Sequence, residues 1–223
     1  MNKRVLTILA VAAVVSPLAV WVVRAQSSKP MTATYISKEE IDTVGKDEQG
    51  KSTQDSLVKT VDLGYENFAL GIIHRGTTHR PPNAGGGGGG GGTANAANAN
   101  APAPQPCGRH MDTLPPGGTP GALTHDFQTE GYLIVSGAGT MMTDGYIVNG
   151  RHTDIQMNGW SCGGMAYDVK KVEVKAGDVI VVPPGVVHGW ADIPDHVDYL
   201  SFRPSQKALE AGYVNPLIQN MKP

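Results

Sequence analysis

A histidine near the C-terminal end of the chain has the surroundings of a metal ligand. His188 follows an apolar run at 179–182 and the turn sequence Pro-Pro-Gly at 183–185. The prolines lack backbone donors and end the first strand, and the glycine supplies a turn. Because side chains alternate along a strand, His188 shares a face with Val186 and Trp190 in the strand that follows. His188 is therefore predicted to point into an apolar interior, as half of a metal site.

Two further candidate ligands flank a short turn earlier in the chain. His125 stands near the end of one predicted strand and Glu130 at the start of the next, so the turn at 126–129 brings the imidazole and the carboxylate close together. Two imidazoles and one carboxylate on rigid strands suit a divalent transition metal with open coordination positions, as in two-histidine, one-carboxylate non-heme iron(II) sites. Fe, Mn, Ni, Cu or Zn would each bind such ligands. The alternative is that His125 and His188 are packed, hydrogen-bonded histidines of a metal-free sugar- or ligand-binding barrel.

The spacing of these residues resembles the two sequence motifs of the cupin superfamily. The second motif is complete, with Gly177, Pro183, Gly185 and His188, and Asp192 stands where that motif has asparagine.

The first cupin motif is matched only in part. Its end is present as Glu130 and Gly137, with His125 in the place of its second histidine and Gly117 in the place of its leading glycine. Leu123 occupies the position of its first histidine. A site that the family builds from three histidines and one glutamate would therefore keep two histidines and the glutamate here. The resemblance extends over residues 117–204 and is strongest to small secreted single-domain bacterial cupins.

The strand pattern agrees with that resemblance. Short apolar segments separated by turn residues are typical of a β-sandwich or barrel, and they predict strands at 122–127, 130–136, 139–143, 146–148, 166–174, 179–182, 186–190 and 199–202. Two earlier strands are expected at 56–63 and 65–74. Ser37 followed by Glu40 is a capping box that predicts a helix within 35–44. We expect an all-β fold, a cupin-type antiparallel β-barrel (double-stranded β-helix, or jelly roll) with a short N-terminal helix.

The first 25 residues have the features of a signal peptide. Lys3 and Arg4 precede an apolar run at 5–23, and Val23 and Ala25 supply the small residues of a cleavage site. The alternative is an uncleaved anchor, because the run is just long enough to span a bilayer. Cleavage leaves 15 basic residues against 20 acidic ones, a net charge of −5, which argues against nucleic acid as a partner.

The middle of the chain is a compositional break. The stretch 81–121 holds 12 of the 29 glycines and 8 of the 16 prolines, including the unbroken glycine run 85–92. A phosphate-binding loop would require a strand before the glycines and a lysine with serine or threonine after them, and neither is present. We predict a Gly/Ala/Asn/Pro-rich disordered insertion at 81–116, between a region holding the helix and the first strands (26–80) and the cupin core (117–204). Residues 205–223 form a C-terminal tail.

Two pairs of residues allow alternative interpretations. Cys107 and Cys162 are the only cysteines, and in an exported chain they are expected to form a disulfide, with two free thiols or a role at the metal as alternatives. His74 and His79 could suggest a second metal site, but a flexible link joins them, so they are poorly preorganised as ligands.

The predicted pocket favours a small organic molecule as ligand or substrate. It is lined by Leu123, Phe127, Tyr132, Ile134 and Trp190, which are apolar or aromatic. No nucleophile is paired with a base, so covalent catalysis is not supported and metal-assisted chemistry remains. The resemblance implies an oxygenase, lyase, isomerase or decarboxylase, and the alternative is a non-enzymatic periplasmic binding or sensing protein.

These features together predict a periplasmic or secreted protein. It would have no membrane association after signal cleavage, and a homodimer is compatible with this interpretation.

Overall fold

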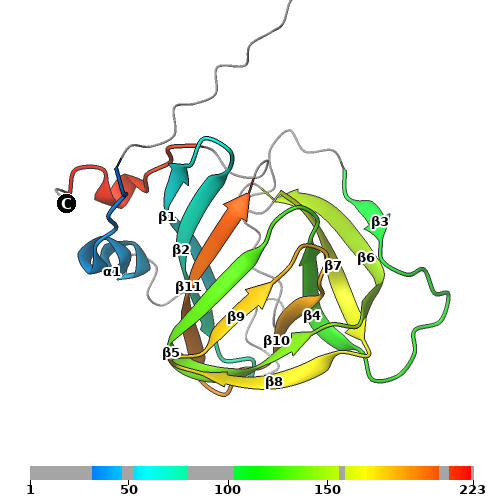
Figure 1. Cartoon of the computed structure of the whole chain (residues 1–223). Coiled ribbons are helices and arrows are strands. Elements are labelled where there is room, and N and C mark those ends of the chain that lie inside the picture. Colours follow the sequence, from blue (N-terminus) through cyan, green and yellow to red (C-terminus); the bar gives the residue numbers. More distant parts are fainter. Residues whose placement is uncertain (1–31, 47–52, 80–102, 156–158, 206–210, 222–223) are drawn as a thin grey trace, which may run out of the picture.

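Antiparallel β-strands make up most of the chain that the structure describes. This computed structural model describes residues 32–46, 53–79, 103–155, 159–205 and 211–221. Its elements are α1 (Lys38–Lys46), β1 (Thr53–Asp62), β2 (Asn67–Gly76), β3 (Gln105–Cys107), β4 (Thr119–His125), β5 (Glu130–Thr143), β6 (Tyr146–Ile155), β7 (Gly159–Tyr167), β8 (Lys170–Lys175), β9 (Val179–Val182), β10 (His188–Asp192), β11 (His196–Ser205) and the 3₁₀-helix η1 (Pro216–Ile218). All pairings between these strands are antiparallel, and the strands form a barrel with α1 outside it (Figure 1). The predicted cupin-type antiparallel β-barrel with a short N-terminal helix is confirmed.

The longest strand, β5, belongs to both sides of the barrel. Its first half pairs with β9 and β11, on the side that continues to β2 and β1. Its second half pairs with β8 and β10, on the side that continues through β4 and β7 to β6 and β3. The bend lies at Gly137, which has φ 69°, and a β-carbon there would lie 2.0 Å from the backbone oxygen of His196. Glycine alone fits this bend, so one bent strand replaces the two predicted at 130–136 and 139–143.

Apolar side chains form two buried clusters. The larger buried cluster comprises Ile73, Tyr132, Ile134, Met141, Val174, Val182, Trp190, Ile193, Val197 and Tyr199. The smaller one comprises Ala122, Met142, Ile147, Cys162, Ala166 and Val187. Removing this apolar surface from water is the main favourable contribution to folding. The two clusters also fix β4, β5 and β10, the strands that carry the candidate ligands.

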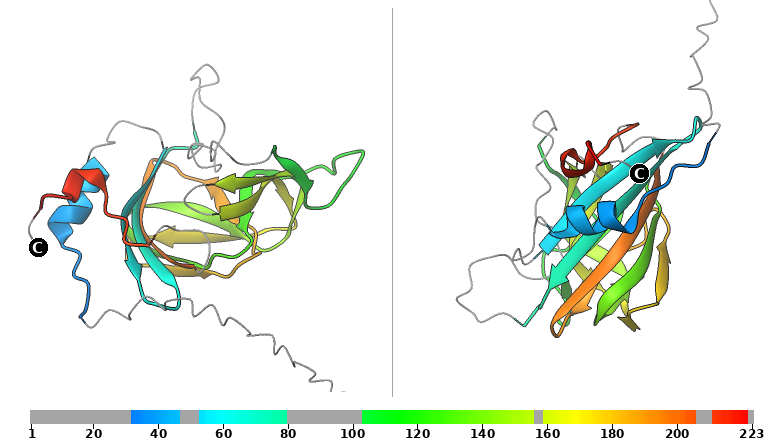
Figure 2. Two further views of the ribbon diagram at one scale, coloured as in Figure 1. Left: turned by 90° about the horizontal axis from the view of Figure 1, so that it is seen from above. Right: turned by 90° about the vertical axis from the view of Figure 1, so that its left-hand side faces the viewer.

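The N-terminal helix begins with the predicted capping box. Ser37 Oγ accepts a hydrogen bond from Glu40 N at 3.2 Å, and Ser37 N donates to Glu40 Oε2 at 2.8 Å. Val44 of α1 packs against Val58 of β1 and Ile218 of η1. The helix and the C-terminal segment therefore lie beside β1 and β2, outside the barrel (Figure 2).

The predicted strand at 166–174 is interrupted. Asp168 has φ 55°, a left-handed conformation that ends β7 and lets β8 begin in a new direction. Two strands therefore occupy the region where the apolar pattern predicts one.

Part of the predicted disordered insertion at 81–116 has a defined structure. β3 pairs with β6, and a disulfide joins Cys107 to Cys162 of β7 with their Cα atoms 6.0 Å apart. Arg109 N also donates to Ile147 O at 2.8 Å. The predicted insertion is therefore too long at its C-terminal end, because strand pairing and the disulfide hold a segment with little apolar surface of its own.

Two predictions concern residues outside the described ranges. They are the signal peptide at 1–25 and the glycine run at 85–92. Among the helices that the structure describes, none is long and apolar enough to span a membrane.

Candidate metal centre

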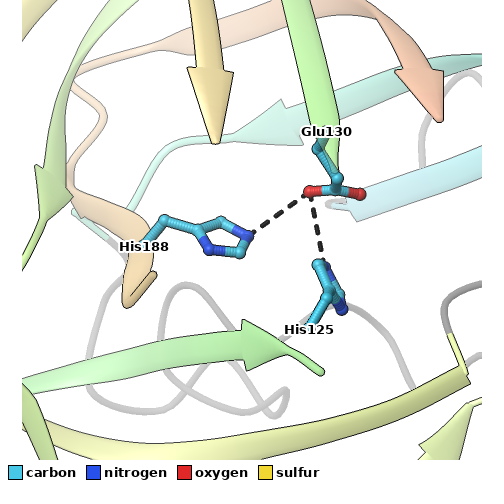
Figure 3. Close-up of side chains that lie close together, drawn as sticks. All are labelled: His125, Glu130 and His188. Carbon is cyan, nitrogen blue, oxygen red and sulfur yellow. Dashed lines mark ion pairs between the residues drawn. The ribbon is translucent and has the colours of Figure 1, made fainter. Parts of the chain in front are cut away.

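Three candidate ligands from three strands meet inside the barrel. His125 ends β4, Glu130 begins β5 and His188 begins β10. Glu130 Oε2 lies 3.4 Å from His125 Nε2 and 3.3 Å from His188 Nε2, and the three side chains point toward one another (Figure 3). Each residue is at most 3% exposed. The structure thus brings together all the metal ligands that the sequence predicts.

The backbone fixes the relative positions of the two histidines. β4 and β10 are neighbours, with Leu123 directly opposite His188 in the ladder. Gly185, in the turn that follows β9, donates its N–H to His125 O at 2.7 Å. The predicted Pro-Pro-Gly turn therefore does more than end β9, because it also holds the end of β4.

The separations of the ligand atoms fit a divalent transition metal. The three atoms all lie within 4.8 Å of one another. Two ligand atoms bonded to one ion at about 2.1 Å lie about 3.0 Å apart at a right angle and about 3.4 Å apart at a tetrahedral angle. The separations of 3.3 and 3.4 Å therefore match bonds to a single ion. Imidazole and carboxylate ligands suit Fe, Mn, Ni, Cu and Zn alike.

Hydrogen bonds at Nδ1 leave the Nε2 atoms of both imidazoles free to bind a metal ion. His188 Nδ1 lies 3.0 Å from Val186 O, a pure acceptor, so Nδ1 carries the proton and Nε2 has the free lone pair. His125 Nδ1 lies 2.8 Å from Ser161 Oγ, whose own hydrogen bond goes to Gly159 O at 3.4 Å. Burial lowers the pKa of His125 despite the nearby Glu130 carboxylate, which keeps this imidazole neutral. Both Nε2 atoms are therefore prepared to bind an ion.

Glu130 is held by two neighbours besides the histidines. Arg203 Nε donates to Glu130 Oε1 at 2.8 Å, and the Tyr132 hydroxyl donates to Oε2. Burial alone would raise the pKa of Glu130, but Arg203 and the imidazoles outweigh it and hold that pKa well below its usual range. Burial, followed by the Glu130 charge, raises the pKa of Tyr132 well above its usual value, so its hydroxyl stays protonated. The carboxylate is thus ionised and directs Oε2 toward the histidines.

Arg203 extends this network across the barrel to β1. Its Nη2 donates to Asp55 Oδ2 at 2.7 Å, and Arg75 Nη2 lies 3.9 Å from the same oxygen. Arg203 is 1% exposed, and the Asp55 and Glu130 charges raise its pKa despite burial. The sequence pattern does not indicate Asp55, Arg75 or Arg203 as part of the site. Each of them lies one residue outside a predicted strand (56–63, 65–74 and 199–202), in the part by which the observed strand is longer.

Buried polar atoms without a hydrogen-bond partner lie in the same region. They include Asp55 Oδ1, Arg203 Nη1 and Ser201 Oγ, and both side-chain amide atoms of Gln128. Gln128 is 1% exposed and stands in the turn between His125 and Glu130. The barrel interior near the candidate centre is therefore more polar than the sequence predicts.

The residues of the predicted pocket lining differ in where the structure places them. Tyr132, Ile134 and Trp190 are buried in the larger cluster, and Leu123 shares the inner face with His188 as its partner in the ladder. Phe127, by contrast, is 58% exposed. The prediction for Phe127 is wrong because β4 ends at His125, so the alternation of side chains does not extend beyond that histidine.

The histidines at 74 and 79 do not form a site together. His74 Nδ1 lies 2.5 Å from Asp198 Oδ1, and His79 Nε2 lies 2.5 Å from Asp192 Oδ1. Each imidazole thus has its own carboxylate partner. Among the described residues, the cluster of His125, Glu130 and His188 is the group that fits a metal ion.

Comparison with known proteins gives likeness in fold alone. No family model matches the chain, and no curated protein matches it. Among solved structures, a double-stranded β-helix protein from Klebsiella pneumoniae is 13% identical, with 79% of this chain and 94% of that chain covered and a TM-score of 0.38. KdgF from Halomonas sp. is 10% identical (72% and 86% covered, TM-score 0.35), and a cupin protein from Bacteroides fragilis is 17% identical (72% and 85% covered, TM-score 0.32). The chain is an antiparallel β-barrel, and these solved structures are similar to it in fold.

Proposed function

We propose that this protein binds a divalent transition metal through His125, Glu130 and His188, and binds or acts on a small organic molecule there. The observation that carries the proposal is the convergence of two Nε2 atoms and one carboxylate oxygen at 3.3 and 3.4 Å in a buried site. Each imidazole is oriented by a hydrogen bond at Nδ1, an arrangement that metal-binding histidines use.

Three protein ligands leave coordination positions for a substrate. When bound, the ion would supply Lewis acidity or the ability to activate oxygen. The residues of this chain would hold the ligand atoms rigidly, exclude water through the surrounding apolar clusters and keep Glu130 ionised through Arg203. Oxygenase, lyase, isomerase and decarboxylase chemistry are each compatible with such a site.

Metal content of the purified protein tests the proposal. Wild-type protein grown with iron, manganese, nickel and zinc should carry one ion per chain, measured by elemental analysis. His188→Ala leaves one imidazole and one carboxylate, too few to retain a first-row ion against a chelator. His152→Ala is a matched control, because His152 pairs with Asp126 at 2.8 Å outside the cluster. Equal metal content in wild type and His188→Ala, or none in either, would contradict the proposal.

A second candidate is a metal-free ligand-binding barrel. It is favoured by one observation: both Glu130 oxygens already accept hydrogen bonds, from Arg203 and Tyr132. A protein that stays metal-free in the experiment above, while keeping its β-rich circular dichroism spectrum, would support this candidate.

We further propose that the protein is exported and that its mature form begins at Gln26. The support is the basic start, the apolar run and the small residues Val23 and Ala25. N-terminal mass spectrometry of protein recovered from a bacterial host decides this point, and a full-length product retained in the membrane would contradict it.

A further inference from the structure

The charges around the candidate centre already cancel without a metal. Glu130 lies 2.8 Å from Arg203, and Arg203 lies 2.7 Å from Asp55, which in turn lies 3.9 Å from Arg75. The side chains of Asp55, Glu130 and Arg203 are at most 6% exposed, and that of Arg75 is 12% exposed. Two carboxylates therefore face two guanidinium groups, and the ligand histidines are neutral when Nε2 binds an ion.

Because these charges cancel, a bound dication would need a further negative charge. In an ordinary site with two histidines and one carboxylate, the carboxylate offsets half of the ionic charge. Here Arg203 already offsets the charge of Glu130, so a dication would leave two positive charges in a buried region. Burying charge without a counter-charge is costly. Resting on the proposed function, we infer that the metal centre of this protein takes a small carboxylate anion as its co-ligand or substrate.

Unpartnered polar atoms beside the network are consistent with an anion. Arg203 Nη1 and Ser201 Oγ are buried donors without a partner, and a β-carbon on Gly71 would lie 3.8 and 3.7 Å from them. Both atoms therefore lie beside Gly71 on the inner face of β2, where a β-carbon would also lie 3.2 Å from Ser56 O. Asp55 Oδ1 is an unpartnered acceptor in the same network, and it would favour a carboxylate that also carries a hydroxyl group.

The rest of the lining favours a carboxylate with a small organic part over an inorganic anion. Tyr132, Ile134 and Trp190 belong to the buried apolar cluster on the same inner face. They offer contact area to carbon atoms, while the ion and the two donors attract the carboxylate oxygens. The inference thus narrows the proposed small organic molecule to one with a negative charge.

The experiment compares acetate with acetamide, which have nearly the same shape and differ in charge. Full-length wild-type protein is loaded with Co²⁺, and its visible absorption is followed during titration with each compound. Acetate should bind at least about tenfold more tightly than acetamide, because only acetate compensates the buried positive charge. Ser201→Ala should weaken acetate binding about threefold to tenfold without changing cobalt content. Ser136→Ala is its control, because the Ser136 hydroxyl bonds to Asp198 outside this network.

Two variants that each remove one charge should shift the affinity for acetate in opposite directions. Asp55→Asn removes a negative charge and should tighten acetate binding about fivefold, whereas Arg75→Gln removes a positive charge and should weaken it about fivefold. General damage to the barrel would weaken binding in both. Lys170→Gln, in an exposed pair with Asp144, should leave acetate binding unchanged.

The outcomes separate this inference from the proposed function. A chain that binds no cobalt contradicts the metal centre and the anion site together. A cobalt-loaded chain that binds acetate and acetamide equally, or whose Asp55→Asn and Arg75→Gln variants shift in the same direction, contradicts the anion site alone.

Discussion

Arg203 and Glu130 are 73 residues apart in the chain, yet Arg203 Nε donates to Glu130 Oε1 at 2.8 Å with both side chains at most 2% exposed. The pair joins the end of β11 to the start of β5. The two oxygens of Glu130 therefore have different partners, because Oε1 binds the guanidinium group while Oε2 faces the histidines.

Loss of Arg203 should destabilise the fold. Arg203→Met leaves Asp55 and Glu130 buried without their shared cation, and breaking a buried pair in this way costs about 3–5 kcal/mol. Urea denaturation of the metal-free protein measures the effect. Lys170→Met removes an exposed cation that bonds to Asp144, and it should leave the midpoint nearly unchanged. Similar midpoints for the two variants would show that the buried network adds no stability.

Ser161 should affect metal affinity without touching the metal. Ser161→Ala removes the partner of His125 Nδ1, so the imidazole loses its fixed tautomer and orientation. Loss of such a partner typically lowers metal affinity about 10–100-fold. Chelator competition measures this effect, with Ser136→Ala as the matched control. Unchanged affinity in Ser161→Ala would mean that packing alone orients His125.

Leu123→His should strengthen the site. Leu123 lies opposite His188 in the ladder and on the same face as His125, so an imidazole there would point toward the two existing ones. We expect affinity to rise about tenfold or more, the scale on which metal sites respond to supporting groups. Leu123→Ala opens the same space without adding a ligand and should not raise the affinity. If the histidine variant binds no more tightly than the alanine variant, position 123 is not a vacant ligand position.

Acid should loosen the N-terminal helix through Glu40. The hydrogen bond from Lys59 Nζ at 2.6 Å, together with those from Ser37, lowers the pKa of Glu40 from its ordinary 4.5 despite burial. A carboxyl with a lowered folded-state pKa contributes stability that is present above the unfolded-state value of about 4.5. That stability is lost as the pH falls through the folded-state pKa. Denaturation midpoints between pH 7 and pH 3 should therefore fall less steeply for Glu40→Gln than for wild type. Glu39→Gln, at an exposed position of α1, is the control and should follow wild type.

The sequence by itself determined the elements whose signals are local. The Pro-Pro-Gly turn ends β9, the Ser37–Glu40 capping box begins α1, and alternation along short strands puts His188 on an inner face. Backbone hydrogen bonding, turn geometry and side-chain alternation act over a few residues, so a pattern of that length is enough to predict them.

Local patterns give wrong predictions where one or two residues change the direction of the chain. Phe127 was predicted to face inward, but β4 ends at His125 and the next residues turn away. Asp168 adopts φ 55° within the single strand predicted at 166–174 and divides it into two strands. The outcome at such positions depends on which strands the neighbouring segments meet, and the local sequence does not contain that information.

Tertiary structure alone decided the charge environment of the centre. Asp55 of β1 reaches Arg203 because β2 and β11 lie between β1 and β5 in the sheet, and Arg203 then reaches Glu130. The separation of Asp55 and Arg203 along the chain is 148 residues. Coulombic interaction depends on distance in space and on burial, both of which the strand order sets. The sequence therefore indicated which residues could bind a metal, and the fold determined that their carboxylate is already neutralised.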